Sequence, residues 1–330
     1  MTAKMRIGIL GAAGIAPKAL VKPSRFVSEV EIVAVAARDE QRAQAFATAW
    51  DIERAYGSYE QLLEDPDVDV IYNPLPNGLH GRWTVASVAA GKHVLCEKPF
   101  AANADEARWV ASQVDKSGLV VMEAFHYRYH PIFARALEIM HSGELGEIVS
   151  IDAAFCDQGP PPGDIRWSLD LAGGALMDVG CYPVHLLRSL MGDEPTVDEA
   201  HAHEQTPGVD ADLDIHMTFP GGVTGTARSS MHSAERDVSA LIVGTRGELA
   251  VQNPFLPQEG NSLTLTVGQT SYVEHATTET TFEFQLRALA DAVLRGAPVV
   301  TDTADAIANM TVIDAGYAAA GLLPRPLTAF

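Results

Sequence analysis

Positive charge is scarce in this sequence. Its 330 residues include 23 Lys and Arg against 43 Asp and Glu, which gives a formal net charge of −20. Nucleic-acid backbones are bound through clustered Lys and Arg, and anionic membrane surfaces attract the same residues. The charge balance therefore argues against both kinds of partner, and its simplest meaning is a well-solvated surface.

Cysteine and long apolar runs are also sparse. Cys96, Cys156 and Cys181 form no CxxC pair and do not have the spacing of metal ligands. Such an odd, sparse set of thiols is typical of a reducing compartment. No run approaches the length of about 18 apolar residues that a membrane span needs, and residues 7–10 are too short a run for a signal peptide. We therefore expect a cytoplasmic protein.

Histidines and carboxylates gather once in the second half of the chain. His201 and His203 lie near Asp210, Asp212 and Asp214, and a spacing of two would place such groups on one face of a strand. Acidic exposed strands are common, however. We expect no metal site.

Strand and helix patterns alternate over residues 5–123. Apolar runs predict strands at residues 6–10, 31–37, 68–72, 93–96 and 120–123. Ala-rich segments between them, such as residues 41–50, 82–90 and 104–117, predict helices. This alternation predicts parallel βαβ units and an α/β fold.

The pattern changes after about residue 150. Turn signals now separate strand-like runs, at residues 148–155, 212–219, 223–230, 239–243, 249–251 and 263–267. Helices are expected at residues 182–191, 283–295 and 303–320. The length suits two domains. We place an α/β domain at residues 1–123 and an α+β domain with an antiparallel sheet at residues 124–330.

A glycine-rich turn follows the first predicted strand. Residues 11–16 read Gly-Ala-Ala-Gly-Ile-Ala and lead towards a helix, where a dinucleotide pyrophosphate needs close backbone approach and a helix N-terminus. Ala13 replaces the second glycine of the usual G-x-G-x-x-G/A pattern, so its methyl group crowds the phosphate. We expect a dinucleotide site at Gly11, Ala13, Gly14 and Ile15; the alternative is an ordinary tight turn between strand and helix.

The end of the second predicted strand indicates which dinucleotide binds. An NAD site places Asp or Glu there to bind the ribose 2′-hydroxyl, but here Ala37 takes that place and Arg38 follows. A guanidinium suits the 2′-phosphate of NADP. Asp39 could still contact a ribose, so NADP is expected and NAD stays possible.

Lys98 stands in the sequence Glu97-Lys98-Pro99, directly after the predicted strand at residues 93–96. A dinucleotide turn followed by a cation at a strand end suggests redox chemistry on a small polar molecule.

These motifs together resemble the Gfo/Idh/MocA oxidoreductases, as do residues 73–80, 90–96, 123–131 and 173–183. The resemblance implies that residues 1–123 form a dinucleotide-binding Rossmann domain and that residues 124–330 form a substrate-binding and oligomerisation domain with an open, mostly antiparallel sheet. It places the substrate between them. It also implies a catalytic role for Lys98, a cis peptide before Pro99, and a homodimer or homotetramer. The residues that it places at the cofactor are Pro76, Asn77, His80, Glu97 and Lys98.

Position 182 separates branches of that family. Many members have an Asp followed four residues later by a His that acts as acid and base; this chain keeps Asp178 but has Tyr182. It thus resembles the branch of dihydrodiol dehydrogenases, glucose–fructose oxidoreductases and NADP-dependent xylose dehydrogenases.

Oxidation of an alcohol requires a group that accepts the hydroxyl proton. A phenol has a pKa of about 10 and is a poor base at neutral pH. An ammonium group beside it, which Lys98 would supply, lowers that pKa and favours the phenolate that accepts the proton.

Other polar residues are candidates for contact with the substrate. Asp178, His185, His126 and Arg166 are assigned to the substrate site. Asp178 could instead fix the backbone, Arg166 could form a surface ion pair, and Tyr182 could simply cap its helix.

The sequence therefore predicts an NADP-dependent oxidoreductase that acts on a sugar, at C1 of an aldose, or on a related vicinal diol. A trans-dihydrodiol dehydrogenase is one alternative. A non-catalytic NAD(P)-sensing regulatory protein is another, but such a protein is expected to lose the catalytic lysine, which this chain retains.

Overall fold

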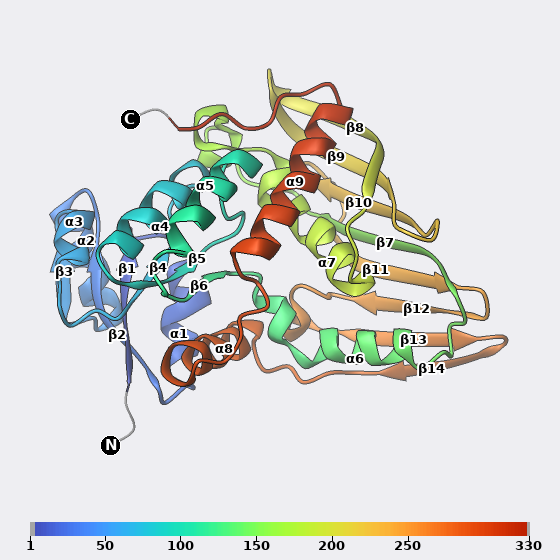
Figure 1. Cartoon of the computed structure of the whole chain (residues 1–330), viewed down its shortest axis with the longest axis horizontal. Helices are drawn as coiled ribbons and strands as arrows, with labels where there is room; N and C mark the ends of the chain where they lie inside the picture. Colours follow the sequence, from blue (N-terminus) through green and yellow to red (C-terminus); the bar gives the residue numbers. More distant parts are fainter. Residues whose placement is uncertain (1–3, 329–330) are drawn as a thin grey trace. The chain divides into compact units, whose positions relative to one another are not determined.

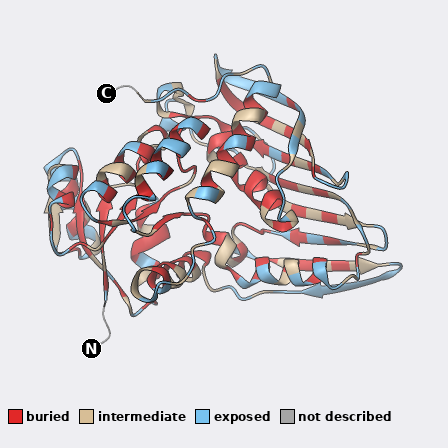
Figure 2. Ribbon diagram, in the orientation of Figure 1, coloured by how far each residue is buried: buried red, intermediate tan, exposed pale blue. Residues whose placement is uncertain are grey.

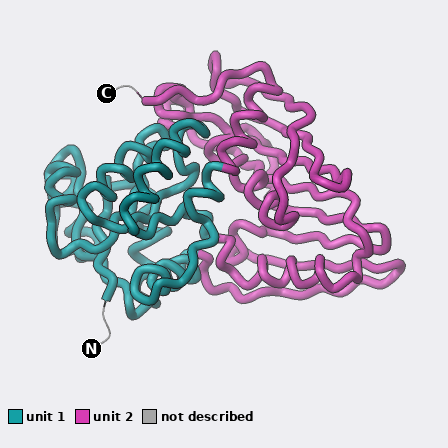
Figure 3. The backbone as a smooth tube through the Cα atoms, viewed as in Figure 1, with its two compact units in different colours: residues 1–126, 282–307 teal, residues 127–281, 308–330 magenta. Residues whose placement is uncertain are grey.

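The structure is a computed structural model that describes residues 4–328 (Figure 1). Residues 1–3 and 329–330 lie outside the described residues. The first three belong to the segment that was considered for a signal peptide. The chain divides into two compact units (Figure 3): unit 1 comprises Met1–His126 and Phe282–Ile307, and unit 2 comprises Tyr127–Thr281 and Ala308–Phe330. The assignment of cofactor and substrate to separate domains stays a prediction.

Unit 1 contains a six-stranded parallel sheet. Its order is β3-β2-β1-β4-β5-β6, which is the Rossmann order and confirms the Rossmann fold that the resemblance implies. The strands are β1 (Met5–Leu10), β2 (Val30–Ala36), β3 (Arg54–Tyr56), β4 (Val70–Asn73), β5 (His93–Cys96) and β6 (Val121–Glu123). Apolar residues fill the central strands, which are buried (Figure 2).

Helices connect these strands, and three of them begin at side-chain caps. They are η1 (Pro17–Val21), α1 (Lys22–Ser24), α2 (Glu40–Trp50), α3 (Tyr59–Leu63), η2 (Asn77–Leu79), α4 (His80–Ala89) and α5 (Ala104–Val114). Asp39, Ser58 and Asn103 each accept a hydrogen bond from a backbone N–H three residues later, at the starts of α2, α3 and α5.

A late segment of the chain completes unit 1. Helix α8 (Thr281–Arg295) contributes Arg295, which pairs with Glu29 before β2. Beyond it, Thr301 O accepts from the Glu123 backbone N at 2.9 Å, and Thr301 Oγ1 donates to Glu123 O at 2.8 Å. The edge of β6 is therefore paired with residues about 180 positions later in the chain.

Unit 2 contains an eight-stranded sheet of order β14-β13-β12-β11-β7-β10-β9-β8. Only the β7–β10 pair is parallel among its described strands, which confirms the predicted, mostly antiparallel sheet. The strands are β7 (Ile148–Cys156), β8 (Thr196–Thr206), β9 (Val209–Thr218), β10 (Thr224–Ser230), β11 (Asp237–Gly244), β12 (Gly247–Gln252), β13 (Ser262–Val267) and β14 (Thr270–Glu274).

Helices pack on this sheet (Figure 1): α6 (Pro131–His141) contacts β12, and α7 (Cys181–Met191) contacts β7 and β10. Helix α9 (Thr303–Ala319) approaches β9 closely, because a Cβ on Gly316 would lie 2.4 Å from Ile215 Cδ1. The short helices are η3 (His126–Tyr129), η4 (Ile165–Trp167), η5 (Leu169–Leu171), η6 (Leu176–Gly180) and η7 (Pro257–Glu259). No helix in the described residues is long and apolar enough to cross a membrane.

A buried ion pair fastens the elements of unit 2. Asp210 on β9 is fully buried and Arg325 is 1% exposed; the two side chains form an ion pair. The other oxygen of Asp210 accepts from the Leu176 backbone N at 2.7 Å, and the Tyr317 hydroxyl donates to Asp210 at 3.1 Å. The guanidinium lies 3.9 Å from the Tyr317 ring centroid and donates to Gly208 O at 2.6 Å. The pair therefore joins β9, η6, α9 and the C-terminal segment.

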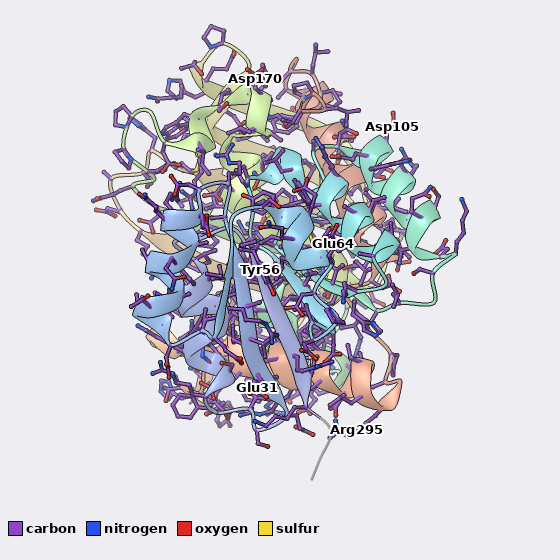
Figure 4. All side chains as sticks on the ribbon, turned by 90° about the vertical axis from the view of Figure 1, so that its left-hand side faces the viewer. Glu31, Tyr56, Glu64, Asp105, Asp170 and Arg295 are labelled. Atoms are coloured by element: carbon purple, nitrogen blue, oxygen red, sulfur yellow. The ribbon has the colours of Figure 1, made fainter. Side chains whose placement is uncertain are left out.

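We predict that Asp210→Ala lowers the free energy of unfolding by about 3–5 kcal/mol, because it leaves a buried guanidinium without its carboxylate. Urea unfolding followed by circular dichroism measures the change. Asp105→Ala is the control, since the Asp105 side chain on α5 is 95% exposed and pairs with Arg108 at the surface (Figure 4). An equal, small effect of both substitutions would contradict this account.

Candidate functional site

The turn after β1 presents open backbone amides. Gly11 has φ +90°, and its N–H donates to Ala36 O at 2.7 Å. Within residues 4–328, the backbone N–H groups of residues 12–15 donate no hydrogen bond. A Cβ on Gly14 would meet no atom within 4 Å, so the space over the turn is open. A row of unpaired N–H groups that leads into η1 fits the pyrophosphate of a dinucleotide.

A positively charged side chain, Arg38, follows the end of β2. Arg38 is exposed, and its guanidinium lies near the hydroxyl of Tyr59. Burial raises the pKa of Tyr59, whereas the charges of Arg38 and Arg42 oppose that rise. Asp39 is engaged elsewhere, because its carboxylate accepts from the Arg42 backbone N at 3.0 Å as the cap of α2. The site therefore suits a phosphate better than a ribose hydroxyl.

The segment after β4 holds three of the predicted cofactor residues. Pro76 and Asn77 are partly exposed, but His80 is only 1% exposed. Its Nε2 lies 2.6 Å from Leu75 O and its Nδ1 lies 2.7 Å from Pro99 O. Burial lowers the pKa of His80 to about 4. Both ring nitrogens thus face the protein's own backbone.

Buried polar contacts hold both sides of Lys98. The Tyr72 hydroxyl donates to Glu97 Oε1 at 2.6 Å, and Glu123 Oε1 accepts from the Phe100 backbone N at 2.8 Å. The peptide bond after Lys98 is cis, as predicted. Lys98 itself is partly exposed, whereas Glu97 and Phe100 are buried. The backbone on each side of the lysine is fixed while part of its side chain stays accessible.

Tyr182 is the second residue of α7 and belongs to an aromatic cluster. It is 7% exposed, and its ring centroid lies 5.3 Å from Phe255, 5.6 Å from Phe155 and 6.1 Å from Tyr127. Asp178 precedes it by four residues in η6, a π-helical turn of a kind that often occurs at functional sites. Residues four apart share a helix face, so Asp178 and Tyr182 are presented together.

The two histidines predicted to contact substrate are buried. His185 is fully buried, and its Nδ1 lies 2.5 Å from the Tyr127 hydroxyl. His126 is 4% exposed, and its ring centroid lies 4.2 Å from that of Phe282 within unit 1. Each packs in its own unit, and their roles at the substrate stay predictions.

Arg166 and Asp178 lie together. Arg166 Nε is 3.1 Å from Asp178 Oδ2, and Arg166 Nη1 is 3.1 Å from Asp164 Oδ1. The charge of Asp178 is the main cause of the raised pKa of Arg166. The neighbouring Trp167 packs on a small cluster that includes Val179. One cation and two carboxylates give this group a net charge of −1.

A metal cluster is absent from the described residues, none of which form a group of three or more His, Cys, Asp or Glu able to hold an ion. His203 Nδ1 lies 3.2 Å from Asp212 Oδ2, on adjacent strands.

Two supporting residues were not among those singled out from the sequence. Tyr59 contacts Arg38, and Tyr127 contacts both His185 and the cluster around Tyr182. Tyr127 lies in the family-like stretch at residues 123–131, so a signal was present. Tyr59 has the pattern of an ordinary core aromatic.

Two family descriptions match consecutive parts of the chain. Residues 5–125 match "Oxidoreductase family, NAD-binding Rossmann fold", and residues 133–250 match "GFO/IDH/MocA C-terminal domain". The matches confirm the resemblance drawn from the motifs.

Named relatives extend the similarity to nearly the full length. D-xylose 1-dehydrogenase (NADP(+)) 2 of Haloferax volcanii is 39% identical, over 96% of this chain and 97% of that protein. Trans-1,2-dihydrobenzene-1,2-diol dehydrogenase of Mus musculus is 36% identical over 77% of each. The solved structure of a 3-ketoreductase from Actinomadura kijaniata, in complex with NADP and TDP-benzene, has a TM-score of 0.88 and 29% identity, and covers 96% of this chain and 98% of that one.

Proposed function

The chain belongs to the Gfo/Idh/MocA oxidoreductase family, and from this premise we propose that it is an NADP-dependent oxidoreductase of a sugar, at C1 of an aldose, or of a related vicinal diol. The observation that carries the proposal is its similarity to a D-xylose 1-dehydrogenase (NADP(+)) along almost the whole of both chains. The similarity to a trans-diol dehydrogenase supports the diol variant.

Unit 1 has the groups that an NADP molecule needs. The open amides at residues 12–15 bind the pyrophosphate, and Arg38, near Tyr59, binds the 2′-phosphate. Pro76 and Asn77 lie beside the nicotinamide ribose. When bound, the nicotinamide accepts hydride from the substrate carbon or returns it. NAD binds more weakly, because Asp39 caps α2 rather than facing a ribose.

Lys98 and Tyr182 move the proton. In oxidation, the substrate hydroxyl gives its proton to the Tyr182 oxygen while its carbon loses hydride; in reduction, Tyr182 returns a proton to the forming alkoxide. The Lys98 ammonium stabilises the phenolate and orients it. The proposal requires the two side chains to meet when substrate is bound. The fixed backbone around Lys98 and the packed ring of Tyr182 support such preorganisation.

The charge around Tyr182 favours an uncharged substrate. Arg166 is shared by two carboxylates, so an anion placed beside it meets a net negative charge. Sugar hydroxyls suit this group, since they donate to Asp178 and accept from Arg166. His126 and His185, both buried, complete the proposed substrate site.

The family resemblance also supports a homodimer or homotetramer, which light scattering at micromolar concentration tests. The sparse cysteines support a cytoplasmic location.

The first test is turnover. With NADP and a panel of pentoses, hexoses and cyclic diols, we expect the absorbance of reduced nicotinamide to rise with an aldose or a vicinal diol. Lys98→Met and Tyr182→Phe each lower kcat at least about a hundredfold. Tyr272→Phe, at an exposed position of β14, is the control. Wild-type turnover in Tyr182→Phe would place the acid and base elsewhere.

Cofactor choice gives a second test. Arg38→Ala should weaken NADP binding at least about tenfold, because a charge-assisted contact is lost, and should leave NAD binding nearly unchanged. Titration calorimetry with each cofactor measures both values. Arg108→Ala on α5 controls for the loss of a positive charge far from β2 in the sequence. Equal weakening for NADP and NAD would overturn the assignment.

Substrate charge gives a third test. Asp164→Asn removes one of the two carboxylates on Arg166, so kcat/KM for a sugar acid should rise about five- to tenfold relative to the matching neutral sugar. Asp170→Asn is the matched control, since Asp170 is an exposed carboxylate on the same loop (Figure 4). The same ratio in wild type and Asp164→Asn would remove Arg166 from the specificity argument.

A further inference from the structure

His80 is held in a fixed place between two segments of unit 1. It is the first residue of α4, and its own carbonyl accepts from Asn73 Nδ2 at 3.1 Å. The ring lies with Nε2 2.6 Å from Leu75 O and Nδ1 2.7 Å from Pro99 O. At 1% exposure, water does not replace either contact.

The chemistry of these contacts is unusual for a buried histidine. A carbonyl oxygen only accepts, and a neutral imidazole has one N–H. Because burial lowers the pKa of His80 to about 4, the ring is neutral at neutral pH and donates to one carbonyl at a time. When the proton is on Nδ1, the ring donates to Pro99 O; when it is on Nε2, the ring donates to Leu75 O.

The two carbonyls belong to segments with different tasks. Leu75 precedes Pro76 and Asn77, and its side chain lies 3.1 Å from where a Cβ on Gly11 would be, at the turn after β1. Pro99 directly follows Lys98. One ring therefore touches the cofactor segment and the turn that carries the catalytic amine.

We propose that His80 is a positioning residue that couples the Leu75–Asn77 segment to the Lys98 turn through its two ring nitrogens, rather than a residue that contacts the cofactor. The inference rests on the proposed function for its kinetic readout. An apolar side chain of similar size would fill the space but leave both carbonyls without a donor, so packing alone does not explain the residue.

Two substitutions separate the contacts. His80→Asn keeps a donor near the position of Nδ1, within reach of Pro99 O; His80→Gln keeps one near Nε2, within reach of Leu75 O. We expect His80→Asn to raise KM for NADP about fivefold or more with kcat little changed. We expect His80→Gln to lower kcat at least about tenfold with KM for NADP little changed. His80→Leu should show both defects.

A readout without turnover accompanies the kinetics. NADP should raise the thermal unfolding temperature of His80→Gln as much as that of wild type, and that of His80→Asn by less. His93→Gln is the control, because His93 is a half-buried histidine at the start of β5 whose Nδ1 accepts from the Val120 backbone N at 2.9 Å. This variant should change stability without a selective effect on either KM for NADP or kcat.

The outcomes are distinguishable. The coupling is overturned if the folded Asn and Gln variants both show a lower kcat together with a higher KM for NADP. It is also overturned if neither constant changes in either variant. If no substrate turns over, the proposed function fails. The shift of the thermal unfolding temperature with NADP still tests the contact between His80 and Leu75 O. If the variants do not fold, nitrogen NMR of the wild-type imidazole decides. A proton that populates both ring nitrogens and resists titration near neutral pH supports the proposal. A proton fixed on one nitrogen, or an ordinary titrating histidine, overturns it.

Discussion

Parallel pairing of β1 with both β2 and β4 is the constraint on which the candidate site of unit 1 depends. The carboxyl ends of parallel strands meet at one edge of a sheet, and the strand order reverses between β1 and β4. The segments that carry Gly11, Arg38, Leu75 and Lys98 therefore all leave the sheet at that edge. Contacts such as Arg38 with Tyr59, or His80 with two carbonyls, only refine an arrangement that the strand order imposes.

Much of the fold follows from sequence patterns because buried strands are uniformly apolar. The strand at residues 93–96 is found at its predicted bounds, and β1, β2, β7 and β10 differ by one or two residues. The misses share a cause. Strands β8 and β14 are edge strands with mostly exposed, polar side chains, so their alternation is weak. Strand β3 has only three residues. Helix α6 was not predicted although His130 caps it and Pro131 begins it.

The candidate site was predictable where a residue belongs to a contiguous motif, as Lys98 and Tyr182 do. It was not predictable where the partner is distant in sequence. No sequence pattern pairs Arg166 with Asp178. An ion pair of Arg166 was one alternative, but its partner was not predicted. His80 was assigned from its motif to the nicotinamide ribose. Burial of its ring against backbone carbonyls is a property of the packed unit, which a linear pattern does not contain.

Thr301 and Glu123 show that unit 1 is built from two separated pieces of chain. A gene fragment that stops near residue 126 would encode β6 with a bare edge, and an unpaired strand edge recruits other chains. Exchange of this unit between relatives thus needs three crossover points, one before Tyr127 and one on each side of residues 282–307. Evolution by shuffling meets the same requirement, which ties the inheritance of the first unit to the last fifth of the polypeptide.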